Sequence, residues 1–159
     1  MRWTILLAAI ALAGCGAREI EPSAYVQLAP APVRVIAVDP AGGQAGLAVG
    51  AALAARGFTV IESPGVSAAP GRTLPVAPGS VLRAEGIDAL LSVGGDRPQM
   101  PETLRATVRH AGRGTVLASV VWKTRFADQI GGALDWATGR TREDVAEKIA
   151  DALVAQLNR

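Results

Sequence analysis

The stretch 33–62 constrains the fold most, because it sets a strand, a helix and a second strand in succession with short joins. VRVIAV (33–38) is a β-branched run, and FTVIE (58–62) is a second one. Between them, QAGLAVGAALAAR (44–56) spaces its apolar residues along one side of a helix and is followed by Gly57, a favoured helix terminator. This order predicts a βαβ unit with parallel strands and a right-handed crossover.

The remainder of the chain predicts an antiparallel hairpin and a closing helix. IDALLSVGG (87–95) has the continuous apolar centre of a buried strand. TLRATVRH (103–110) alternates apolar and polar residues, AGRG (111–114) forms a turn, and TVLASVVW (115–122) returns; a helix begins near Thr141. The predicted fold class is α/β, with a mixed (α+β) sheet, a βαβ start, a C-terminal antiparallel hairpin and helices packed on the sheet.

Strict alternation counted from the turn, with His110 opposite Thr115, gives the predicted hairpin two faces. The first strand forms an apolar face from three residues: Leu104, Ala106 and Val108. On the other face this register sets Arg105 opposite Val120 and Arg109 opposite Val116, with Trp122 beyond them. Unless a helix covers that face, an exposed apolar patch rimmed by arginines is typical of a protein-binding surface. The candidate interaction residues are therefore Arg105, Arg109, Val120 and Trp122.

The amino terminus is typical of an export signal. Arg2 provides a positive charge, an apolar segment follows, and small residues lead to Cys15. The apolar run is too short for a spanning helix, which needs about 20 residues. Residues 1–14 are therefore predicted to be a signal peptide.

The four residues LAGC (12–15) resemble the lipobox of bacterial lipoproteins. The resemblance implies cleavage before Cys15, a diacylglycerol on its thiol and an acylated amino group, and such multiple acyl chains give stable membrane anchoring. Gly16 stands where enterobacterial lipoproteins retained in the inner membrane carry Asp, which favours the outer membrane. We expect residues 15–32 to be a lipidated tether and residues 33–159 to be a periplasmic domain, with the long Pro- and Gly-rich stretch 63–79 as a loop.

Composition excludes several classes of function. The chain has 16 Lys and Arg against 14 Asp and Glu, and removal of Arg2 with the signal leaves 15 against 14. This balance does not indicate nucleic acid as a partner. With its one cysteine acylated, the mature chain has no thiol for a disulfide, a metal site or a nucleophile.

No pattern of catalytic residues is present in the sequence. His110, the one histidine, lies at the predicted hairpin turn, and no Gly-x-Ser-x-Gly occurs. The glycines after Asp39 fit neither Gly-x-Gly-x-x-Gly nor the P-loop, and Asp39 itself is most simply a turn residue. The chain is therefore predicted to be no enzyme, with no catalytic, cofactor-binding or metal-binding residue.

A family resemblance rests on VIAV, ALAARGFTVIE, LRAEGIDALLSVGG, LRATVRHAGRGTVLASVVW and VAEKIADAL, taken in order. Together they resemble the periplasmic α/β domain of CsgG-type curli secretion lipoproteins and LpoB-type activators of peptidoglycan synthases. The chain lacks the long amphipathic hairpins with which the CsgG type forms a barrel, and its tether is shorter than that of the LpoB type. A secretion pore and direct activation of an inner-membrane synthase are thus disfavoured.

The resemblance implies a membrane-anchored, non-catalytic envelope module that binds an envelope protein or assembles with itself as a homo-oligomer. Two alternatives remain open at this point. One is an accessory lipoprotein of an envelope transport system that binds a lipid or small ligand, and the other is a hydrolase.

Overall fold

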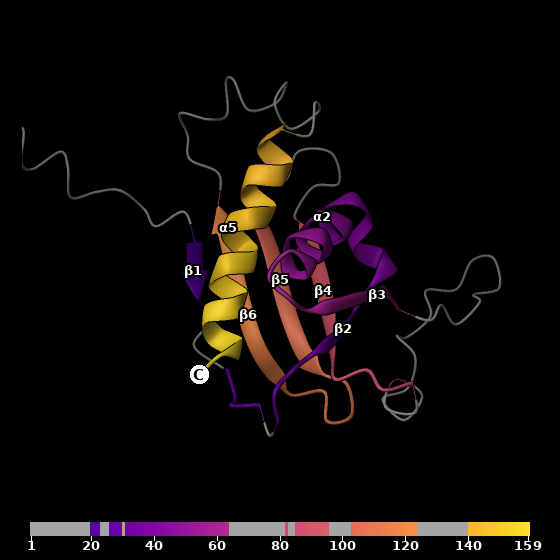
Figure 1. Ribbon diagram of the computed structural model, residues 1–159. Coiled ribbons are helices and arrows are strands. Elements are labelled where there is room, and N and C mark those ends of the chain that lie inside the picture. The colour runs from indigo at the N-terminus through magenta and orange to yellow at the C-terminus, as the bar shows by residue number, and fades with distance from the viewer. Residues whose placement is uncertain are drawn as a thin grey trace, which may run out of the picture.

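The computed structural model describes residues 20–22, 26–29, 31–63, 82, 85–95, 103–123 and 140–159 (Figure 1). The predicted signal peptide, Cys15 and residues 64–79 lie outside these ranges. Within the described part of the chain, no helix has the length and apolar character needed to cross a membrane.

The predicted βαβ unit is confirmed. It consists of β2 (Val35–Val38), α2 (Gly43–Ala54) and β3 (Thr59–Glu62), with a short 3-10 turn at Pro40–Gly42 before the helix. β2 and β3 are parallel, and Val35 lies opposite Thr59. The turn begins at Asp39, whose carboxylate Oδ1 accepts a hydrogen bond of 2.9 Å from the backbone N–H of Ala41.

The other elements complete a mixed sheet. They are β1 (Ile20–Pro22), β4 (Ala89–Gly95), β5 (Thr103–His110), β6 (Val116–Lys123) and α5 (Arg140–Leu157). The described strands form one six-stranded sheet in the order β1-β6-β5-β4-β2-β3. β2 is parallel to both β3 and β4, whereas the pairs from β4 through β5 and β6 to β1 are antiparallel. The predicted α/β class, central strand and C-terminal hairpin are therefore confirmed.

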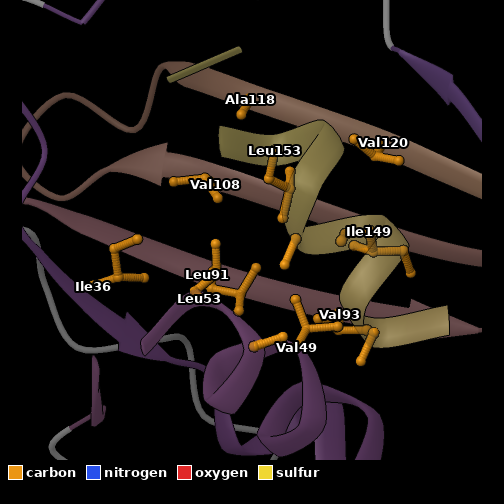
Figure 2. Packing of buried hydrophobic residues seen from close by; sticks show 14 of the residues in the cluster. Ile36, Val49, Leu53, Leu91, Val93, Val108, Ala118, Val120, Ile149 and Leu153 are labelled. Carbon is orange, nitrogen blue, oxygen red and sulfur yellow. The ribbon is translucent and has the colours of Figure 1, made fainter. Parts of the chain in front are cut away.

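The main core lies between one face of this sheet and both helices. In Figure 2, Val49 and Leu53 of α2 and Ile149 and Leu153 of α5 meet the side chains of the central strands. α2 contacts β2, β3 and β4, while α5 contacts β6 and β1 and also packs against α2. One face of the β4-β5-β6 part of the sheet is thus buried beneath helices.

Two contacts fix α2 in this layer. A Cβ at Gly50 would come within 2.9 Å of a Val38 methyl group, so the absence of a side chain lets the helix approach β2 closely. At the end of α2, Arg56 forms ion pairs with Glu147 at 2.6 Å and Asp151 at 2.8 Å on α5. The hydrogen bond from Arg56 holds the pKa of the Asp151 carboxyl below its ordinary value.

The sheet begins earlier in the chain than predicted. Ile20–Pro22, assigned to the tether 15–32 from sequence, pairs antiparallel with β6, and Glu21 forms an ion pair of 2.9 Å with Lys123. Farther along, the backbone N–H of Gln27 donates a hydrogen bond of 2.8 Å to Val116. Part of the predicted tether therefore belongs to the sheet, because β6 offers an unpaired backbone edge to which Ile20–Pro22 adds.

The predicted hairpin register holds next to the turn, where Arg109 lies opposite Val116, but it is wrong for the rest of the hairpin. Val108 lies opposite Ala118, but Arg109 lies opposite Val116, so Leu117 is an extra residue in a β-bulge. Because side chains alternate with a period of two, one added residue moves the rest of the strand to the opposite face. Val120 and Trp122 consequently face the helices.

Candidate functional site

The face of β4, β5 and β6 that points away from the helices carries a cationic groove. Its lining residues are Ser92, Gly94, Gly95, Thr103, Arg105, Thr107 and Arg109. We call this the arginine groove, and its volume is about 480 Å³. Gly94 lies opposite Arg105 on the neighbouring strand, and a Cβ built on Gly94 would contact nothing within 4 Å. The missing side chain therefore leaves open space beside Arg105.

The two arginines project from the same face of one strand. Arg105 and Arg109 are separated by four residues, which is about 13 Å along an extended chain. Both are exposed. Nη1 of Arg109 donates a hydrogen bond of 3.3 Å to the carbonyl of Gly114, whereas Arg105 makes no hydrogen bond or ion pair to another described residue. The Arg105 guanidinium is accordingly available to an external acceptor.

The surface of the groove between the two arginines is polar, and its hydroxyl groups already have hydrogen-bond partners. The hydroxyls of Thr107 and Ser119 lie opposite each other on β5 and β6, are buried, and form a hydrogen bond of 3.3 Å. Because these two hydroxyls bond to each other, specificity toward a ligand in the groove rests on the arginines. Guanidinium groups bind carboxylates and phosphates through paired hydrogen bonds.

The predicted interaction surface was partly wrong. Arg105 and Arg109 lie on the open face as expected, but Val120 and Trp122 are 0% and 5% exposed and belong to the core under α5. The bulge at Leu117 is the cause, because it turns both side chains away from the arginines. The open face is therefore a cationic groove rather than an apolar patch.

Two polar residues considered for chemistry have structural roles. Nδ1 of His110 accepts hydrogen bonds from the backbone N–H groups of Gly112 and Arg113, at 3.0 and 3.1 Å, and so organises the hairpin turn. Oδ2 of Asp39 accepts from the hydroxyl of Ser92 at 3.3 Å, while its other oxygen caps the 3-10 turn. Asp39 therefore lies at a turn as predicted, whereas His110 is the last residue of β5 and holds the turn that follows it.

Within the part of the chain that the structure describes, no three His, Cys, Asp or Glu residues gather in a way that would hold a metal ion. The chemistry that the described residues offer at the arginine groove is electrostatic, namely binding of a carboxylate or phosphate.

Of the comparisons with known proteins, only the one with solved structures found similar proteins. No family model matches the chain, and no curated protein matches it. Among solved structures, a dodecamer of a PelC variant from Paraburkholderia phytofirmans is similar, with 16% identity, 89% of this chain and 98% of that chain covered, and a TM-score of 0.46. TolB from Acinetobacter baumannii has 14% identity and a TM-score of 0.48, over 87% of this chain and 31% of that one.

Lipoprotein GNA1162 from Neisseria meningitidis is a third neighbour, with 18% identity, 74% of this chain and 99% of that chain covered, and a TM-score of 0.38. No residue role is transferred from these proteins.

Proposed function

We propose that this chain is an envelope lipoprotein, anchored in the outer membrane by acyl chains on Cys15, whose domain faces the periplasm. The lipobox-like LAGC after a short apolar segment supports the anchor. The resemblance of its strand and helix segments to the CsgG-type and LpoB-type domain supports the location. Gly16, in place of Asp, supports the outer membrane.

Cys15→Ser is expected to abolish incorporation of radioactive palmitate and to leave the precursor uncut in the inner membrane, because the thiol that receives the lipid is gone. Labelling in cells followed by membrane fractionation measures both effects. Gly16→Asp is the matched control, which should keep the label and shift the protein toward the inner-membrane fraction. Palmitate that persists on Cys15→Ser contradicts the anchor.

For the domain, we infer a non-catalytic module that binds a protein partner through the arginine groove. The observation that carries this inference is the exposed Arg105 guanidinium, which has no hydrogen-bond or ion-pair partner among the described residues. Arg109 lies on the same face, and the Thr107 and Ser119 hydroxyls between the two arginines bond to each other. Two positive charges about 13 Å apart on an extended strand match carboxylates spaced along a partner's surface. The partner is therefore expected to present acidic side chains.

The double variant Arg105→Glu with Arg109→Glu is expected to lose the partner, because it replaces attraction by repulsion in the groove. Arg113→Glu lies in the exposed turn outside the groove lining and serves as the charge-reversal control. The measurement is cross-linking in intact cells followed by purification of the lipidated protein and mass spectrometry of what is bound. Unchanged bound proteins in the double variant would overturn the assignment of the groove.

A further inference from the structure

The strand that sequence reasoning missed shortens the link between the membrane and the domain. β1 begins at Ile20, five residues after Cys15. Five residues span at most about 18 Å, even fully extended. A link that extended as far as residue 33 would leave the domain free to turn in any direction. This inference rests on the proposed lipidation of Cys15.

The link leaves the domain at one defined end. Ile20 lies opposite Trp122, next to the last residue of β6, Lys123. α5 begins at this same end and runs back along the sheet, so that Gln156 reaches Ser119 and the carboxyl terminus lies at the opposite end (Figure 1). The turn at residues 111–114 also belongs to the opposite end.

We propose that the domain stands on the bilayer with the end that holds Ile20, Lys123 and the start of α5 toward the lipid headgroups. The hairpin turn and the carboxyl terminus then point into the periplasm. The arginine groove runs along β5 away from the membrane, with Arg105 nearer the lipid and Arg109 farther out.

Two labels, one in the first turn of α5 and one directly after its last residue, test this orientation. Glu143 and Asn158 are both exposed, and a rise of about 1.5 Å per residue sets them about 22 Å apart along α5. With Cys15 acylated, Glu143→Cys and Asn158→Cys each introduce the one reactive thiol of the chain. Each lipidated variant is labelled with a fluorophore and placed in phosphatidylethanolamine–phosphatidylglycerol vesicles that carry a headgroup-attached quencher. Strong quenching is expected at position 143 and little at position 158.

A longer link is the control. Inserting 20 Gly and Ser residues between Gly16 and Ala17 keeps the anchor but frees the domain to turn, so the difference between the two labels should disappear. Equal quenching in the original chain, or stronger quenching at 158, overturns the orientation. Mass spectrometry of Cys15 is performed first, and an unacylated Cys15 overturns the proposed anchor instead.

Discussion

Trp122→Ala is expected to lower the free energy of unfolding by about 3–5 kcal/mol, the usual cost of truncating a buried aromatic side chain. Trp122 is 5% exposed, lies between Ile20 and Leu104 on the neighbouring strands, and belongs to the core covered by α5. Its loss leaves a cavity where β1, β6 and α5 meet. Urea denaturation followed by far-UV circular dichroism measures the change.

Val121→Ala is the matched control, because it alters the adjacent residue on the other face of β6, where the side chain is half-buried. It should cost clearly less than Trp122→Ala. If the two variants were equally stable, the bulged register would be contradicted, and the register counted by strict alternation, with Trp122 on the open face, would be favoured.

Periodicity was sufficient to predict most of the fold. The βαβ unit, β4 and the hairpin each have a pattern of apolar residues long enough to specify an element. β1 has no such pattern: it is three residues long and ends at Pro22. It exists because the edge of β6 offers backbone partners, and this tertiary cause cannot be read from the short segment itself.

The error in the candidate site has a different physical origin. β6 is apolar at nearly every position, so its sequence does not distinguish one register from another. One feature of the sequence indicates the correct register: Ser119 is the one polar residue in the middle of that strand, and Thr107 is its counterpart on β5. Pairing these two hydroxyls, as the structure does, requires the bulge and places Trp122 in the core.

The edge of β6 depends on one buried amide. β1 covers residues 120–122, and Gln27 bonds to Val116, which leaves the backbone of Ser119 between them. The side chain of Gln156 on α5 fills this position: its Oε1 accepts from the Ser119 N–H at 3.0 Å, and its Nε2 donates to the Ser119 carbonyl at 3.2 Å. The Gln156 side chain therefore makes the two hydrogen bonds that a neighbouring strand would make, and it links α5 to the sheet.

Gln156→Leu is expected to destabilise the domain by about 3 kcal/mol, because two buried backbone groups lose their partners and each unmet group costs roughly 1–3 kcal/mol. Leucine has a similar size, so the loss of hydrogen bonds rather than of volume dominates. Urea denaturation measures the stability, and hydrogen exchange measures the Ser119 amide directly, which should exchange faster than its neighbours in β6.

Gln44→Leu makes the same substitution at an exposed position of α2 and should change the stability by no more than about 0.5 kcal/mol. A difference between the two variants therefore isolates the contact with Ser119. If Gln156→Leu kept the stability and left the Ser119 amide protected, the edge of β6 would be held by β1 and Gln27 alone. The position of α5 would then rest on its apolar contacts with the sheet, and the amide would be dispensable.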